Sequence, residues 1–295
     1  FKIQNGNQTS GAGATDEVFL TYNIEAQDLA QSGWDYTSSS SNITLSFWVK
    51  SSVAQQFQVN MRLYPASGDQ KELCFEYTPS ANTWTKVTKT IPGAAGNVLR
   101  NTNELGMFIQ FPQFYGTDFT ANSRPFDTWE TKNNNQNYKD YATTWYTTDN
   151  ATWEITGLQL EVGSVATDFE HKSFAQDLAL CQRYYQQLGG NTTQELLMHG
   201  TFNGAGTVTG FYEAPVEFRT RPTFSISNVS HVNCYGFNAV DAGSPTSMTL
   251  INAMTDKHWI YIDNALSSNV GTGGLTAMVR ANSTTACKFT LDAEL

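Results

Sequence analysis

The hydrophobic period changes once along the sequence Trp153-Glu-Ile-Thr-Gly-Leu-Gln-Leu-Glu-Val-Gly-Ser-Val-Ala-Thr-Asp-Phe-Glu-His-Lys-Ser-Phe-Ala-Gln-Asp-Leu-Ala-Leu-Cys-Gln-Arg-Tyr-Tyr185, and this change decides the fold. Apolar and polar residues alternate up to Val162, apart from an interruption at Gly157, which predicts a half-buried strand with a bulge or a close backbone approach. From Ser173 onward the apolar residues recur every three or four positions, and Gln176 completes a capping box with Ser173. The pattern predicts a strand, a joint and a helix that connects two modules.

The predicted helix continues to Leu188 and stops at Gly189-Gly190. Its apolar stripe consists of Phe174, Leu178, Cys181, Tyr185 and Leu188. A helix of about 16 residues that lies between two β-modules must bury such a stripe against something. It could pack on its own modules, or three copies of the chain could form a short axial bundle, and the sequence leaves both solutions open.

The composition limits the class of protein. The 295 residues are sufficient for two ordinary domains. Only 15% are charged, against about 25% in average proteins, and 13% are aromatic. The net charge of −10 argues against binding of a phosphate backbone, so we expect no nucleic-acid partner. No apolar run reaches the length of a membrane span, so we expect no membrane insertion. The chain starts at Phe1 without a methionine, and we expect that residues precede it in the natural protein.

Strand patterns dominate residues 1–167. They are short, rich in aromatic and β-branched residues, and bounded by Gly, Ser, Asn or Pro. The expected strands are Phe19–Ile24, Thr44–Val49, Phe57–Tyr64, Lys71–Tyr77, Thr83–Ile91, Leu105–Phe111 and Trp153–Val162. This series predicts a β-sandwich. Trp84, which starts one of these strands after a turn, is expected to lie in the core or at its edge rather than to serve as a ligand platform.

Residues 168–190 form the predicted connector, and strand patterns resume over residues 191–295. The expected strands there are Leu196–Phe202, Thr207–Tyr212, Ala214–Arg219, Thr223–Ile226, Met248–Ile251, Trp259–Ile262, Leu275–Arg280 and Cys287–Leu291. They predict a second β-sandwich, so the fold class is all-β with one connecting helix. The four cysteines are widely spaced, which leaves two alternatives, a Cys234–Cys287 disulfide or four buried or half-buried free thiols.

A family resemblance rests on the same junction. The pattern W-x-I-T-G-L-Q-L-E-V-G from Trp153, followed by A-T-x-F-E-H and L-A-L-C-Q-R-Y-Y, resembles the junction of tail fibres and related virion proteins of tailed bacteriophages, marine ones especially. The resemblance covers Leu45–Leu188 well and the last third loosely, where Val216-Glu-Phe-Arg-Thr-Arg-Pro-Thr is similar to a segment of fibre tips. It implies an N-terminal jelly roll similar to carbohydrate-binding modules, a variable β-rich C-terminal domain, a homotrimer and a place on the exterior of the virion.

The chain departs from the family pattern between Phe111 and Trp153, where a compact module needs only a short link. This insertion, residues 111–152, is rich in aromatic residues set among Asn, Thr and Asp. Sugar rings stack on aromatic side chains, while amides and carboxylates bind hydroxyl groups. The candidate glycan-binding residues are Trp129, Tyr138, Tyr141, Trp145 and Tyr146. The competing interpretation is that these aromatics hold subunits together.

The sequence contains few motifs that are typical of catalysis or metal binding. The four histidines have no metal-ligand spacing, and neither a nucleophile elbow nor a calcium loop is present, so we expect no catalytic residue, no metal and no cofactor. Glu130 with Asp127 or Asp140 is the carboxylate pair to test for glycoside cleavage. We therefore expect a non-enzymatic phage tail fibre or appendage that attaches to host-surface glycan. The alternatives are a capsid decoration protein or head fibre that binds other virion proteins, and a polysaccharide depolymerase.

Overall fold

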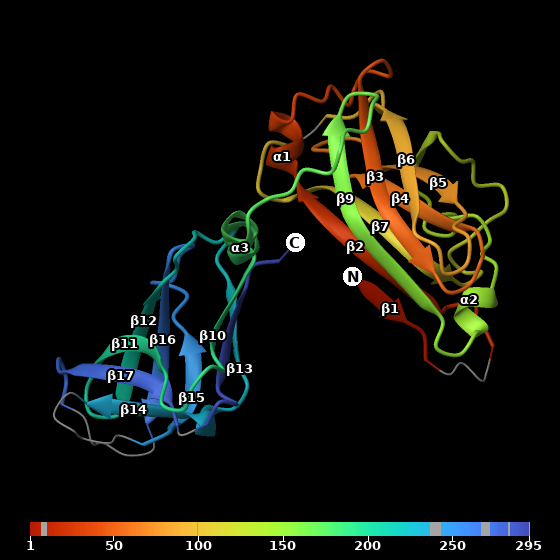
Figure 1. The fold of residues 1–295 in the computed structure, drawn as a ribbon. Coiled ribbons are helices and arrows are strands. Elements are labelled where there is room, and N and C mark those ends of the chain that lie inside the picture. Colours follow the sequence, from red (N-terminus) through yellow and green to blue (C-terminus); the bar gives the residue numbers. More distant parts are fainter. Residues whose placement is uncertain (7–10, 99, 237–242, 267–271, 283, 295) are drawn as a thin grey trace. The chain divides into compact units, whose positions relative to one another are not determined.

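The computed structural model describes residues 1–6, 11–98, 100–236, 243–266, 272–282 and 284–294. They form two compact units, Phe1–His171 and Lys172–Glu294, and Figure 1 shows that each unit consists mainly of strands. The prediction of an all-β fold is thereby confirmed. Within these ranges, no helix is long and apolar enough to cross a membrane.

The first unit is a β-sandwich of two antiparallel sheets. The four-stranded sheet has the order β1-β9-β3-β6, and the five-stranded sheet has the order β2-β7-β4-β5-β8. The strands are β1 (Lys2–Gln4), β2 (Glu17–Glu25), β3 (Asn42–Ser51), β4 (Phe57–Leu63), β5 (Lys71–Tyr77), β6 (Thr85–Pro92), β7 (Leu105–Tyr115), β8 (Trp129–Thr131) and β9 (Thr152–Val162). Two short helices, α1 (Ala26–Gln31) and α2 (Thr144–Thr147), accompany them. The chain crosses repeatedly from one sheet to the other, as in a jelly roll.

The alternation of strand residues fills the space between the two sheets. On β3 the side chains of Leu45, Phe47 and Val49 point into the core and are fully buried, because successive residues of a strand face opposite sides. Phe47 packs edge-on against Phe111 and Tyr77, with ring centroids 5.2 and 5.4 Å away. Both aromatic contacts cross from one sheet to the other, so they hold the sandwich together.

The second unit pairs a six-stranded sheet of order β14-β17-β11-β12-β16-β15 with a three-stranded sheet of order β10-β18-β13. The strands are β10 (Tyr185–Gly189), β11 (Leu196–Phe202), β12 (Thr207–Glu213), β13 (Thr223–Ile226), β14 (Val232–Gly236), β15 (Pro245–Leu250), β16 (Trp259–Leu266), β17 (Thr276–Ala281) and β18 (Lys288–Asp292). A buried core that includes Phe218 and Phe289 lies between these sheets. The prediction of a strand at Ala214–Arg219 is wrong, because these residues form no strand. Instead, Arg219 donates hydrogen bonds from Nε and Nη2 to the carbonyls of Ala293 and Glu294, each 2.9 Å long.

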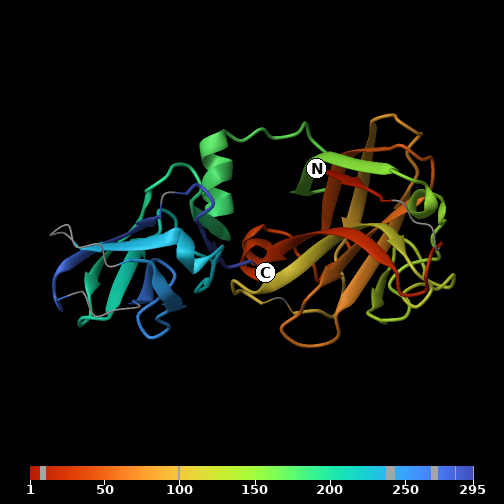
Figure 2. The same ribbon diagram turned by 90° about the horizontal axis from the view of Figure 1, so that it is seen from below.

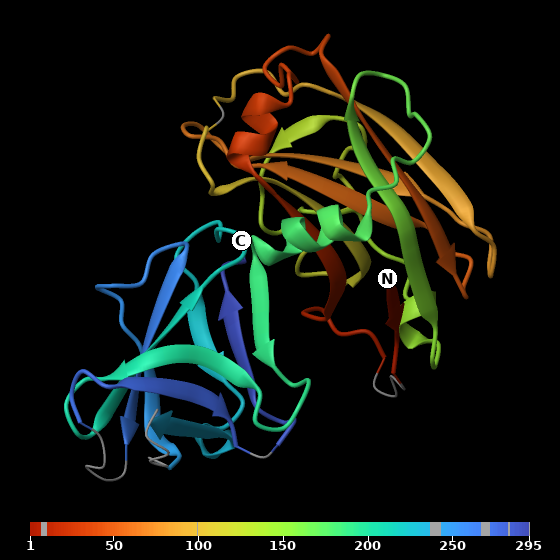
Figure 3. The same ribbon diagram turned by 60° about the vertical axis from the view of Figure 1, so that its left-hand side comes forward.

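The joint differs from its prediction in the length of the helix. Ser173 and Gln176 form the predicted capping box, but α3 spans only Phe174–Gln182. Figure 2 shows the irregular segment that leads into α3, and Figure 3 shows α3 passing directly into β10. Tyr185 and Leu188 therefore belong to a strand, because residues 185–189 pair with β18, and Leu188 packs on the core of the second unit. Gly189 ends this strand rather than a helix.

The cysteines are free thiols. Cys74, Cys234 and Cys287 are buried, so the alternative of a Cys234–Cys287 disulfide is wrong. Cys181 differs from the expectation because it is exposed on α3. Burial raises the pKa of the Cys287 thiol to about 11, which keeps it protonated and unreactive near neutral pH.

Candidate functional site

The aromatic insertion is packed onto its own sandwich. Trp145 is fully buried, and Tyr138 and Tyr146 are nearly so, whereas Trp129 and Tyr141 are half-buried. Tyr146 stacks on Phe114 with ring centroids 4.4 Å apart, and Tyr138 stacks on Tyr115 at 4.6 Å. The ring faces that a sugar would need are therefore already in contact with protein.

The burial of these side chains contradicts the prediction that they bind glycan. Tyr138, Trp145 and Tyr146 do not offer a stacking platform, and they do not offer a subunit interface either, because residues of the same chain cover them. Trp129 is also engaged, since its indole N–H donates a 2.8 Å hydrogen bond to the carbonyl of Pro92. The sequence located the aromatic segment but did not show which surface it covers.

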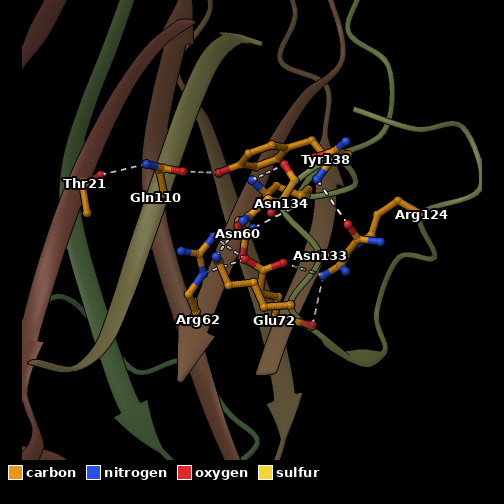
Figure 4. Close-up of polar contacts among 12 residues, drawn as sticks. Thr21, Asn60, Arg62, Glu72, Gln110, Arg124, Asn133, Asn134 and Tyr138 are labelled. Carbon is orange, nitrogen blue, oxygen red and sulfur yellow. Dashed lines mark hydrogen bonds and ion pairs between the residues drawn. The ribbon is translucent and has the colours of Figure 1, made fainter. Parts of the chain in front are cut away.

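A polar cluster lies beneath the insertion, on the face of the five-stranded sheet that points away from the core (Figure 4). Arg62 of β4 donates from Nε to a carboxylate oxygen of Glu72 at 2.6 Å, and Nη2 of Arg124 lies 3.7 Å from the other oxygen. Arg124 comes from the insertion and also donates to the backbone carbonyl of Glu72 at 3.1 Å. Glu72 is fully buried, so its charge is compensated only by these two guanidinium groups and their hydrogen bonds.

The same cluster contains a chain of neutral groups. Gln110 donates to the hydroxyl of Thr21 at 3.1 Å and accepts hydrogen bonds from Tyr115 and Tyr138. Burial raises the pKa of Tyr138 well above its usual value, so it remains a neutral donor. These contacts fasten the insertion to the sheet, which is a structural role.

Residues of the insertion line a hollow of about 270 Å³ that includes Phe114, Tyr115 and Tyr141, and a larger hollow is open on the outer surface of the insertion. The volume of the larger hollow is about 580 Å³, and it is lined by Thr117, Asp118, Phe119, Asn134 and Asn135. The amides of the predicted Asn-rich segment do reach this surface, but Phe119 is the one aromatic ring among the lining residues. Stacking of a sugar would therefore have a single partner here.

The carboxylates proposed for catalysis are engaged in other contacts. Asp127 forms an ion pair with Lys89 at 2.5 Å, and Asp140 accepts a 2.7 Å hydrogen bond from Thr120. Glu130 lies on β8 directly opposite Glu72 of β5. In the part of the chain that the structure describes, no group of three or more His, Cys, Asp or Glu residues could hold a metal ion.

Two tryptophans are exposed on the outer face of the four-stranded sheet. Trp48 lies on β3 and points away from the core, because its neighbours Phe47 and Val49 point into it. Trp84 immediately precedes β6 and lies two residues before the exposed Lys86, so the two side chains point to the same side of the sheet. Each indole is 41% exposed. The expectation that Trp84 belongs to the core or its edge is therefore wrong.

The register brings these tryptophans together. Trp48 is paired with Lys86 of β6, so Trp84 lies diagonally across from it, at a distance of about 7 to 8 Å between Cα atoms. Lys50 lies two residues from Trp48 on the same face, and its Nζ is 5.0 Å from the centroid of the Trp84 ring. Lys50 also forms a 2.9 Å ion pair with Glu154 of β9. We call the surface formed by Trp48, Lys50, Trp84, Lys86, Glu154 and Thr156 the tryptophan face.

Gly157 supports this surface in the way that the interrupted alternation predicts. The pairing of β3 with β9 shifts between Ser46 and Trp48, which is a bulge, and Gly157 has a φ of +59°. A Cβ atom at Gly157 would lie 3.2 Å from Cδ1 of Trp48 and 3.9 Å from the ring of Phe169. Glycine therefore permits the indole to lie close to the backbone.

The joint covers the other half of the same sheet face. Thr44 donates to the carbonyl of Gly163 at 2.8 Å, and Gln159 donates to Thr167 at 3.2 Å. A hydrogen bond from Gln159 and those from Thr167 lower the pKa of the Glu161 carboxyl group. The A-T-x-F-E-H segment thus lies on the first unit and leaves only the tryptophan end of the face open.

Comparisons with known proteins add little beyond the fold. No protein-family model and no curated protein matches the chain. Among solved structures, the chain is similar to a "Family 16 Carbohydrate Binding Module-2" with a TM-score of 0.25 and 12% identity, over 54% of this chain and 73% of that chain. It is also similar to a "putative secreted protein" from Parabacteroides distasonis ATCC 8503 with a TM-score of 0.26 and 9% identity, over 99% of this chain and 88% of that chain. The strands of the two units define the class of the protein as all-β, and the site must be argued from its own residues.

Proposed function

We propose that the chain is a non-enzymatic structural protein of a tailed-bacteriophage virion, a tail fibre or similar appendage, which attaches to host-surface glycan through the tryptophan face. The virion assignment is supported by the resemblance of the Trp153–Tyr185 junction. The binding assignment is supported above all by the two indoles, Trp48 and Trp84, that are exposed side by side in the register of one sheet.

The chemistry of this face suits a sugar chain. An indole presents a flat apolar surface to the C–H groups of a pyranose ring, and the surrounding Lys50, Glu154 and Thr156 supply donors and acceptors for hydroxyl groups. Because Trp48 lies on β3 and Trp84 immediately precedes the partner strand β6, the sheet holds them at a fixed separation. Little ordering of the protein is then required on binding.

Affinity electrophoresis tests this proposal. The full chain is run through native gels that contain purified bacterial capsular polysaccharides or O-polysaccharides, and the double variant Trp48→Ala/Trp84→Ala is compared with it. We expect retardation of the wild type and an apparent affinity at least about tenfold weaker in the variant, since two stacking contacts are lost. Tyr22→Ala, which removes an exposed aromatic from the other sheet, is the matched control. Equal retardation of the double variant and the wild type would exclude the tryptophan face.

Self-association through α3 is a second part of the proposal. None of the residues of α3 is buried, and Phe174, Leu178 and Leu180 are 82%, 43% and 50% exposed. This exposure favours the three-helix bundle over packing on the chain's own modules. Sedimentation velocity should show a trimer for the wild type and a monomer for Phe174→Asp/Leu178→Asp. A monomeric wild type would contradict this part.

A further inference from the structure

The six-stranded sheet of the second unit carries a row of large side chains that no part of the proposed function uses. In the antiparallel register, Tyr235 of β14 faces Met278 of β17, which faces His199 of β11. His199 in turn faces Phe211 of β12, which faces Tyr261 of β16. We call these five residues, Tyr235, Met278, His199, Phe211 and Tyr261, the aromatic row.

The aromatic row lies on the outer face of the sheet. The residues next to it along the strands, among them Val279 and Ile262, are buried in the core of the unit, so the row points the opposite way. His199 is exposed, and the other four side chains are half-buried. The ring centroids of His199 and Phe211, and those of Phe211 and Tyr261, are 6.4 Å apart. The row therefore forms a continuous surface across five strands.

A second row of hydroxyl groups runs parallel to the first. On β17, β11, β12 and β16 it lies two residues along the strand from the aromatic row, about 7 Å away, and it extends to β15, which has no residue in the aromatic row. Its members, four threonines and one aspartate, are also paired across the sheet. They are Thr276, Thr201, Thr209, Asp263 and Thr249. Thr209 donates a 2.7 Å hydrogen bond to Asp263, which leaves the second oxygen of that carboxylate for another donor. We call this set the hydroxyl row.

The size of the aromatic row argues against a protein partner. Five strands span about 19 Å, and the aromatic row together with the residues two positions away on either side of it covers only about 300 Å². A stable protein interface requires about 800 Å² from each partner. A linear oligosaccharide is as narrow as the row, and it combines apolar ring faces with hydroxyl edges in the same parallel arrangement.

The charge of the chain indicates what kind of oligosaccharide would bind. The net charge of −10 repels long acidic polymers. The charged side chains two residues from the row along its strands are Arg280, Asp263 and Glu213, and Glu213 lies 3.1 Å from Nε2 of His258. Arg280 is itself stacked over the ring of Tyr235, with Cζ 4.2 Å from the centroid. We infer that the aromatic row and the hydroxyl row together form a second glycan-binding site, which takes a neutral linear polysaccharide lying across the strands.

The test separates this site from the tryptophan face, because the two lie on different units. Affinity electrophoresis uses four soluble neutral polysaccharides, dextran, laminarin, galactomannan and xyloglucan, with four proteins: the wild type, Trp48→Ala/Trp84→Ala, Phe211→Ala/Tyr261→Ala and the combination of all four changes. Met254→Ala, an exposed apolar residue of the same unit, is the matched control. Far-UV circular dichroism confirms that each variant is folded.

We expect that Trp48→Ala/Trp84→Ala is still retarded by at least one of these polysaccharides and that adding Phe211→Ala/Tyr261→Ala weakens this binding about tenfold. The proposal is overturned if Trp48→Ala/Trp84→Ala is retarded by none of the four, or if the added changes leave its retardation unaltered. It is also overturned if Phe211→Ala/Tyr261→Ala alters the sedimentation coefficient without altering retardation, since the row is then an interface between copies. If the tryptophan face binds no glycan but the aromatic row does, the result is different: Trp48→Ala/Trp84→Ala is then retarded as strongly as the wild type.

Discussion

The aromatic insertion and the tryptophan face both contain tryptophans, but these side chains are buried or half-buried in the one and exposed in the other. In the insertion, Tyr138 and Trp145 are buried against the five-stranded sheet, whereas Trp48 and Trp84 are exposed on the four-stranded sheet. The insertion has many aromatics because it must cover a polar sheet face, and the tryptophan face has few because nothing covers it. An excess of aromatic residues in a long loop is therefore a sign of packing as much as of binding. Single aromatics at outward strand positions are better candidates for ligand contact.

The largest effect that separates these regions should come from Trp145→Ala. Removal of a fully buried indole should lower the free energy of unfolding of the first unit by about 3 to 5 kcal/mol. Urea unfolding followed by circular dichroism measures this change. Trp84→Ala, as the control, should cost less than about 1 kcal/mol, since it removes one exposed contact with Lys50. Comparable costs for the two variants would mean that the two regions do not differ in burial.

The next effect should follow from Glu72→Gln. The substitution keeps the shape of the side chain but leaves Arg62 and Arg124 without their buried counter-charge, and we expect a loss of about 3 kcal/mol. The same substitution at Glu154, whose ion pair with Lys50 is partly exposed, should cost less than about 1 kcal/mol. Limited proteolysis should cut residues 117–143 faster in Glu72→Gln, because Arg124 fastens that segment. Unchanged proteolysis would show that the ion pairs do not hold the insertion.

Alkaline pH should weaken the first unit, in part through the tyrosines of the insertion. Burial raises the pKa values of Tyr138 and Tyr141 above the unfolded value of about 10, so folding favours the neutral phenols. The stability that they contribute is fully present below that unfolded value and is lost as the pH rises toward the folded value. Thermal unfolding of the first unit should therefore shift steeply downward above about pH 10, and Tyr141→Phe should reduce the slope. A slope that Tyr141→Phe leaves unchanged would assign the loss to other groups.

The smallest effect on stability is expected from Gly157→Ala. This substitution should also alter the tryptophan face. Gly157→Ala forces a side chain into a left-handed backbone conformation and places Cβ 3.2 Å from the Trp48 ring, at a cost of about 1 to 2 kcal/mol. The displaced indole should change the near-ultraviolet circular dichroism and weaken retardation in the affinity gels. Gly163→Ala, which also has a positive φ but has no atoms near its Cβ position, is the control for backbone strain alone.

The sequence predicts the fold well where alternation is strong. β5, β11 and β13 have the bounds that their residues predict, and the bulge at Gly157 follows from one interruption of the pattern. The failures have physical causes. Tyr185 and Leu188 continue the helical spacing of α3, but pairing with β18, more than a hundred residues away, converts them to a strand. Long-range pairing of this kind leaves no local signal.

The candidate site was harder to predict than the fold for the same reason. A signal for Trp48 was present, since it is the outward residue between Phe47 and Val49 in a strand whose inward side is clearly apolar. Trp84 lacks such a pattern, because it precedes its strand, and its exposure depends on the register with β3. The covering of the insertion could not be foreseen, because it depends on Glu72 and Arg124, which lie far apart in the sequence.

Resonances of the indole N–H groups give the most direct test of the central claim. The seven tryptophans give seven such resonances in a nitrogen-15 correlation spectrum, and an oligosaccharide cut from the polysaccharide that retards the protein most is titrated into the sample. We expect the resonances of Trp48 and Trp84 to shift with a common binding curve while those of the buried Trp145 and Trp153 stay in place. Shifts at Trp145 with none at Trp48 and Trp84 would contradict it, because the glycan would then bind through the insertion and not through the tryptophan face.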